Sequence, residues 1–130
     1  MSLLRRLFPR RRRAASSGAL RSFERRLGYD FTDSDLLRLA LTHRSFANEQ
    51  SLPEQNERLE FLGDAVLGLV TGEELYRRHR EMPEGELSRR KSYLVSEVSL
   101  AEMAVELELG RVLRLGVGED RSGGRSKPSL

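Results

Sequence analysis

After residue 17, apolar residues recur at intervals of three and four, which is the spacing of one face of an α-helix. Leu20, Phe23 and Leu27 predict a first helix by this criterion. Gly28 then offers a residue that tolerates the left-handed conformation in which many helices end. Because the same spacing returns in most of the later segments, the sequence predicts an all-α fold.

A second helix is predicted over the apolar positions 36–41. Thr32 or Asp33 precedes it and can cap its N-terminus with a side-chain oxygen. We expect His43 and the two residues after it to end this helix. A lone histidine beside an apolar helix suits a structural hydrogen bond better than a ligand role. Polar residues and a proline within positions 48–55 then predict a loop.

The longest apolar pattern runs from Leu59 to Leu75 and covers almost every side of the expected helix. This distribution predicts a helix that is buried nearly all round. Glycine interrupts the pattern at Gly63, Gly68 and Gly72. Each glycine costs a helix about 1 kcal/mol relative to alanine. We therefore expect another backbone to approach closely there, either within the core or across a subunit boundary.

Two further helices are predicted between Pro83 and Gly110, with a kink near Ser96. Pro83 suits a first helical position, and Gly110 is expected to close the second helix. From Arg111 onward, glycines break the period and predict a loop-like segment. Residues Lys127–Leu130 resemble the capped start of another helix. We therefore expect this sequence to stop just before an element of its own fold.

Charge is distributed unevenly along the 130 residues, although the net charge is only +3. Residues 1–13 hold six of the 23 basic residues and no acid, which leaves 17 basic against 20 acidic residues in the remainder. We expect residues 1–17 to form a disordered arginine-rich tail, and residues 18–130 to form one domain. The tail could attract phosphates. An organelle-targeting segment is the alternative interpretation.

The chain has no cysteine, which excludes disulfides and thiolate metal sites. It also has no apolar run of the length that a bilayer-spanning helix needs. We therefore expect a soluble, cytoplasmic protein without a membrane partner.

Acidic residues stand out at the start of the long apolar helix. At about 100° per residue, Glu57, Glu60 and Asp64 fall within an arc of roughly 60°, so their carboxylates share one stripe. No lysine or arginine lies between Arg58 and Arg77 to neutralise them. Since a buried charge without a partner is costly, a divalent cation would be a suitable partner. The alternative is a helix-dipole role for Glu57, with arginines from other segments answering the other two acids.

The nine residues from Asn56 to Asp64 resemble the signature of the ribonuclease III endonucleases. Other segments resemble the family in the same order, and together they cover about residues 20–130. These segments are Leu41–Ser45, Glu84–Ser88, Leu94–Ser96, Leu113–Gly116 and Ser122–Gly124. The acidic triplet alone would be a weak signal, but the signature with its flanks is specific. The resemblance implies the helical fold of the ribonuclease III endonuclease domain.

The same resemblance implies a Mg²⁺-dependent endoribonuclease that cuts double-stranded RNA and processes ribosomal, messenger and transfer RNA. Its candidate catalytic residues here are Asp64, Glu60 and Glu57. Glu60 and Asp64 would bind the metal, with Mn²⁺ as an alternative to Mg²⁺, and Glu57 would hold neighbouring groups in place. Glu84 would support the site. Phe61 would anchor a homodimer, with ordinary core packing as the alternative.

In this family, the next helix supplies two further carboxylates, and these would follow residue 130 here. A double-stranded-RNA-binding domain usually comes after that helix. We therefore expect the complete protein to be the enzyme, and the 130-residue chain by itself to be inactive or nearly so. The competing hypothesis is a non-catalytic, ribosome-associated RNA-binding domain on the same fold. The retained acids argue against it, because acids that face polyanionic RNA without a metal weaken binding.

Overall fold

The computed structural model describes residues 18–127, and the regular secondary structure there is helical, apart from an isolated parallel β-bridge between Thr42 and Arg114. The all-α prediction is confirmed. The elements are α2 (Gly18–Leu27), α3 (Ser34–Ala40), α4 (Arg44–Glu49), α5 (Glu57–Arg78), α6 (Glu84–Leu94), α7 (Glu97–Glu106), η1 (Leu109–Arg111), α8 (Val117–Arg121) and η2 (Gly124–Ser126). The expected disordered tail at residues 1–17 and the helix start expected at residues 128–130 lie outside the described residues.

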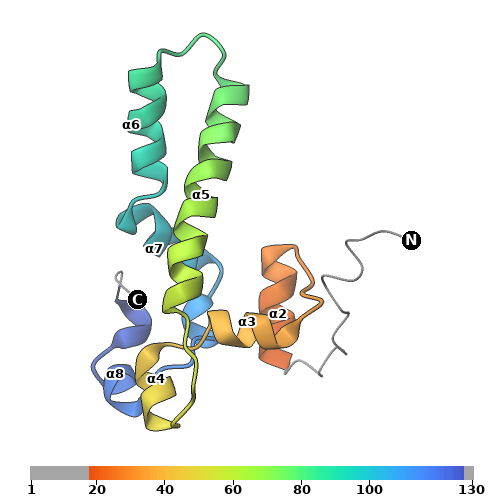
Figure 1. Ribbon diagram of the computed structural model, residues 1–130, viewed down its shortest axis with the longest axis vertical. Helices are drawn as coiled ribbons and strands as arrows, with labels where there is room; N and C mark the ends of the chain where they lie inside the picture. Colours follow the sequence, from red (N-terminus) through yellow and green to blue (C-terminus); the bar gives the residue numbers. More distant parts are fainter. Residues whose placement is uncertain (1–17, 128–130) are drawn as a thin grey trace.

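The long helix α5 and the helix α6 run antiparallel as a hairpin that projects from a base of shorter helices (Figure 1). The base contains α2, α3, α4 and α8, and the first turn of α5 rises from it. No helix within residues 18–127 has the combination of length and apolar character that crossing a membrane requires.

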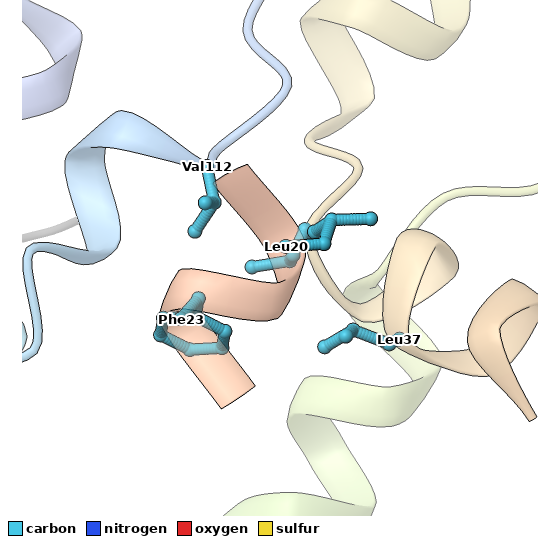
Figure 2. Close-up of a cluster of buried hydrophobic side chains, with 5 residues drawn as sticks. Leu20, Phe23, Leu37 and Val112 are labelled. Atoms are coloured by element: carbon cyan, nitrogen blue, oxygen red, sulfur yellow. The ribbon is translucent and has the colours of Figure 1, made fainter. Parts of the chain in front are cut away.

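The apolar core lies in the base and joins the two ends of the described chain. Leu20 and Phe23 of α2 face Leu37 of α3 and Val112, which follows η1 (Figure 2). Leu41 completes this cluster, and all five side chains are buried. Full burial of each large side chain contributes about 1.5–3 kcal/mol. The core therefore fixes the end of α3 relative to η1, and these two elements flank the start of α5.

Several local predictions are confirmed by the backbone. Gly28 follows α2 in the left-handed conformation, with φ of +68°. Asp33 caps α3, because its carboxylate accepts hydrogen bonds from the backbone N–H groups of Asp35 and Leu36 at 3.0 and 3.1 Å. Ser96 separates α6 from α7 and caps α7 by accepting from a backbone N–H.

The predicted end of the second helix is wrong. Helix α3 stops at Ala40, and Arg44 begins the separate short helix α4. His43 is the N-cap of α4: its Nδ1 accepts from the backbone N–H of Ser45 at 3.3 Å and lies 2.8 Å from the Ser45 hydroxyl oxygen. The structural role predicted for this histidine is therefore confirmed.

Helix α4 and the equally short α8 hold each other in place. The Ser45 hydroxyl oxygen accepts from the Gly116 N–H at 2.9 Å, and the Glu49 carboxylate accepts from the Val117 N–H at 2.9 Å. A Cβ on Gly116 would lie 2.9 Å from the Ser45 backbone carbonyl carbon as well as 2.6 Å from a Glu49 carboxylate oxygen, so this approach requires glycine. The loop predicted after Arg111 is therefore wrong in part, because tertiary contacts rather than apolar spacing stabilise α8.

The role predicted for Gly110 is also wrong. Helix α7 ends at Glu106, and Glu108, with φ of +52°, takes the left-handed conformation that we expected from glycine. Gly110 lies within η1, where a Cβ would come within 3.0 Å of the Arg125 carbonyl oxygen. Its small size permits a close contact between η1 and η2.

The predicted burial of α5 is wrong for the chain by itself. Within α5, only Leu75 is buried, whereas Phe61 is 83% exposed and Leu69 is 73% exposed. A Cβ added to Gly63 or Gly68 would meet no atom within 4 Å, so no backbone of the described chain approaches them. Within residues 18–127, α6 is the helix against which α5 packs extensively, and it covers only part of the α5 surface.

Candidate functional site

Asn56 fixes the start of α5 to the end of α3. Its backbone N–H donates to the Thr42 carbonyl at 3.0 Å, and its side-chain amide donates to the Ala40 carbonyl at 3.1 Å. Its own carbonyl accepts from the Glu60 N–H at 2.8 Å, which is the first hydrogen bond of the helix. Although Asn56 occupies the N-cap position, its side chain makes no capping hydrogen bond. The asparagine therefore links two helices instead of capping one.

Gln55 and Arg44 hold the carboxylate of Glu57. The Gln55 side-chain oxygen accepts from the Glu57 N–H at 2.7 Å, and its amide nitrogen donates to the Glu57 carboxylate at 2.8 Å. The Arg44 guanidinium lies 3.7 Å from the same carboxylate. Glu57 thus lies in the first helical turn, as the alternative interpretation expected, but the arginine from another segment reaches Glu57 and not Glu60 or Asp64. The contact between Arg44 and Glu57 could not be predicted from the sequence, because it depends on the position of α4 relative to α5.

Glu60 and Asp64 have different surroundings from Glu57. Both are exposed, and no described residue forms a hydrogen bond or an ion pair with either carboxylate. They lie one helical turn apart, a spacing that puts their Cβ atoms about 5–6 Å from each other. The burial that we invoked for the acidic stripe is wrong for this chain, because all three acids reach solvent. What remains is a pair of carboxylates without a cationic side chain.

The chemistry of this pair fits Mg²⁺. That ion prefers oxygen ligands and is often held by one or two carboxylates, with waters and substrate phosphates completing its shell. Glu60 and Asp64 supply two such oxygen donors and leave room for the other ligands. Within residues 18–127, no group of three or more carboxylate or imidazole side chains is arranged around a common point for a metal ion.

A groove of about 1230 Å³ opens beside Glu60, between the first turn of α5, α7, η1 and η2. We call it the Glu60 groove; its lining includes Leu59, Glu60, Leu100, Ala104, Leu113 and Arg125. Glu97 and Glu108 also line it, and the sequence analysis did not single them out. Glu108 is paired with Arg26 at 3.0 Å, whereas Glu97 has no ion pair among the described residues. An acid in the first turn of a predicted helix was the available signal for Glu97.

Arg125 holds the far wall of the Glu60 groove. Its guanidinium donates to the carbonyls of Gly110 and Leu113 at 2.6 and 2.8 Å, and to the Asp120 carboxylate at 2.8 and 3.3 Å. These bonds join η2 to η1 and to α8. Next to them, the hydrogen bond that Lys127 donates to Glu119 lowers the pKa of the Glu119 carboxyl.

The other two sequence candidates lie apart from the acid pair. Glu84 begins α6 at the end of the hairpin that is distant from the start of α5 (Figure 1), and it accepts a hydrogen bond from the Ser88 hydroxyl at 2.6 Å. Phe61 is next to Glu60 in the chain, but its ring reaches into solvent. Core packing against the described residues 18–127 is therefore excluded for Phe61, and within the same residues Glu84 lies away from the acids.

The all-helical arrangement matches solved nuclease domains. Two structures of the nuclease domain of ribonuclease III from Campylobacter jejuni are similar to it. One, with a TM-score of 0.78 and 45% identity, covers 85% of this chain and 74% of that chain, and is described as having structural flexibility in a region involved in dimer formation. The other has a TM-score of 0.79 and 44% identity, over 87% of this chain and 74% of that one. The fold is thus that of a ribonuclease III nuclease domain.

The chain belongs to the ribonuclease III family. The family model described as ribonuclease-III-like matches residues 33–130. Ribonuclease 3 of Magnetococcus marinus is 53% identical over 85% of this chain and 48% of the relative. Ribonuclease 3 of Heliobacterium modesticaldum is 56% identical over 82% of this chain and 46% of the relative. The chain therefore spans about half the length of these curated relatives, and the family predicted from the signature is confirmed.

Proposed function

We propose that the complete protein carrying this chain is an endoribonuclease that cuts double-stranded RNA. The observation that carries the proposal is the pair Glu60 and Asp64, which stands exposed and without a cationic partner among the described residues, in a chain of the ribonuclease III family. Processing of ribosomal, messenger and transfer RNA in the cytoplasm is the role that we propose for this activity.

Glu60 and Asp64 would hold the metal ion, which we take to be Mg²⁺, with Mn²⁺ as a substitute. The bound ion would lower the pKa of a water ligand and offset the charge that develops on the phosphate oxygens. The two side chains would fix its place at the mouth of the Glu60 groove. Since Asp64 follows Glu60 by one turn on a rigid helix, their spacing does not depend on a loop.

Glu57 would act on the geometry of the site, because its carboxylate is already engaged by Gln55 and Arg44. These two contacts hold the first turn of α5 against the loop before it and against α4. The supporting role of Glu84 stays a prediction, because this chain places it at the other end of the α5–α6 hairpin from Glu60 and Asp64. In the chain itself, its carboxylate bonds the hydroxyl of Ser88.

The exposed apolar side of α5 fits a second copy of the chain. Phe61, Leu69 and other large side chains of this helix face solvent, although their spacing is typical of a buried helix. The open space around Gly63 and Gly68 would admit a close helix there. The Campylobacter relative, with its region involved in dimer formation, supports a homodimer. A two-fold dimer suits duplex RNA, since each subunit could cut one strand, and A-form RNA is selected mainly by its shape.

The test is cleavage of duplex RNA by the complete protein with Mg²⁺. Glu60→Gln and Asp64→Asn keep the size of each side chain and remove its charge. We expect each to lower kcat by at least about a hundredfold, since a lost ligand to a catalytic metal removes several kcal/mol of transition-state stabilisation.

Glu73→Gln is the matched control, because Glu73 lies on the same helix and pairs at the surface with Arg77. We expect it to keep normal turnover. Wild-type turnover in both Glu60→Gln and Asp64→Asn would exclude the acid pair from the reaction. Duplex binding without cleavage by the unmodified protein would favour the non-catalytic RNA-binding alternative.

A further inference from the structure

The signature begins with Asn56, whose side chain has no part in the chemistry proposed above. Its amide does not cap α5 and donates instead to the Ala40 carbonyl at 3.1 Å. Because capping is the usual reason for asparagine at a helix start, this side chain serves a different purpose here. It connects the helix that carries the acids to the helix before it.

The acceptors of Asn56 are held firmly. Thr42, whose carbonyl accepts from the Asn56 backbone, is only 1% exposed. Its hydroxyl donates to the Arg38 carbonyl at 2.6 Å and accepts from the Arg114 guanidinium at 3.0 Å. The adjacent Leu41 belongs to the apolar core. The end of α3 is therefore a fixed support for whatever is bonded to it.

The first turns of α5 have little other support. Phe61 and Leu62 face solvent, Leu59 is half-buried in the lining of the Glu60 groove, and α6 is the helix with which α5 packs extensively within residues 18–127. The position of the Glu60 backbone relative to the Glu60 groove thus depends on polar contacts at the helix start. Glu57 makes the contacts to Gln55 and Arg44, whereas Asn56 makes those that reach the end of α3 and also bonds the Glu60 N–H.

We infer that Asn56 is a positioning residue, which sets the place of the Glu60 carboxylate by fixing the first turn of α5 to the end of α3. The inference rests on the proposed function, because it takes Glu60 as a metal ligand. Groups that orient metal ligands typically change metal affinity or activity by about 10–100-fold when they are removed. Loss of the Asn56 amide should act at the lower end of that range, because its backbone N–H remains bonded to Thr42.

Two substitutions in the complete protein separate positioning from helix stability. Asn56→Ala removes the amide. Asn56→Ser also removes the bond to Ala40 but keeps a polar side chain at the helix start, so the two variants lose the same contact with different replacements. Asn48→Ala is the matched control, since Asn48 is an exposed asparagine of α4 whose side chain has no hydrogen-bond partner among the described residues.

Three measurements are made on each protein: the melting temperature without metal, Mn²⁺ affinity by electron paramagnetic resonance without RNA, and kcat and KM on duplex RNA. We expect Mn²⁺ affinity to fall about tenfold in both Asn56 variants, with lower kcat and unchanged KM. Each Asn56 variant loses one hydrogen bond of about 1 kcal/mol, so both melting temperatures should fall by only a few degrees and both proteins should stay folded at the temperature of the Mn²⁺ measurement. Asn48→Ala should be normal in all three measurements.

Wild-type Mn²⁺ affinity in both Asn56 variants would refute the positioning role. So would an affinity that falls only as far as the folded fraction falls at the temperature of the measurement, because that result describes a purely structural residue. An equal loss in Asn48→Ala would refute it too. If the wild-type protein bound no Mn²⁺ and cut no duplex, the proposed function would fail first and the positioning role with it.

Discussion

Arg125 offers a direct test of how the wall of the Glu60 groove is held. Replacing it with glutamine at the same position, Arg125→Gln, removes the donors to the Gly110 and Leu113 carbonyls and the ion pair with Asp120. Each carbonyl bond contributes about 1 kcal/mol. The ion pair adds at most roughly 0.5 kcal/mol, because both of its side chains are more than a third exposed and are screened by water.

The expected loss of unfolding free energy for Arg125→Gln is therefore about 2–3 kcal/mol. For a domain of this size, each kcal/mol shifts the melting temperature by about 4–8 °C, so the drop should be roughly 10 °C or more. Arg125→Lys keeps the charge, but the single ammonium group of lysine lacks the planar, forked donors with which arginine reaches two carbonyls and a carboxylate. It should therefore recover only part of the lost stability.

The assay is urea unfolding followed by circular dichroism, with a thermal scan as a second measure. Arg121→Gln is the control, since Arg121 is an exposed neighbour whose side chain has no hydrogen bond or ion pair among the described residues. It should stay within about 0.5 kcal/mol of the wild type, as surface substitutions generally do. A change of that small size in Arg125→Gln would show that the bonds to η1 do not hold the groove wall.

Two other predictions concern the α5 surface and the end of the described chain. Phe61→Ala should weaken self-association by roughly a hundredfold or more in analytical ultracentrifugation, because a symmetric dimer would bury two such rings at about 1.5–3 kcal/mol each. Tyr29→Ala is the control, since Tyr29 is an exposed aromatic residue outside α5, and it should leave self-association unchanged. Lys127→Gln should remove the stabilisation that Lys127 gives to the ionised Glu119 carboxylate. That stabilisation is complete above the ordinary Glu119 pKa of 4.5 and is lost as the pH falls through the lowered pKa of the folded state. The unfolding free energies of wild type and variant should therefore converge in acid titrations. Dimers of unchanged affinity, or a stability difference that persists in acid, would contradict these two expectations.

Local signals in the sequence predicted local structure well. Gly28 and Asp33 could be placed at helix ends because a left-handed glycine and a capping carboxylate act on their own few residues. The errors came where distant segments decide. Helix α4 starts after its N-cap His43, but the bonds that hold it come from Gly116 and Val117, which lie 71 and 68 residues from their acceptors Ser45 and Glu49 in the sequence.

The apolar pattern of α5 misled for a different reason. A pattern of hydrophobic side chains indicates that a surface is covered, but it does not indicate whether the same chain or another chain covers it. Phe61 was therefore predicted as either core or dimer anchor, and the structure removes the first of these for the chain by itself. The predicted burial of the three acids is wrong for the same reason, because that prediction rested on the apolar residues around them.

The acids show what helical spacing can and cannot establish. Periodicity correctly puts Glu57, Glu60 and Asp64 on one side of one helix, and on that ground alone they are equivalent. The fold makes them unequal, since Gln55 and Arg44 reach only the first turn of α5. A carboxylate that accepts a hydrogen bond from an amide and lies near a guanidinium binds a cation less readily than a carboxylate that is only hydrated. The proposed division between a positioning acid and two metal ligands therefore depends on where Gln55 and α4 lie, and moving Arg44 away should make the surroundings of Glu57 more like those of Glu60.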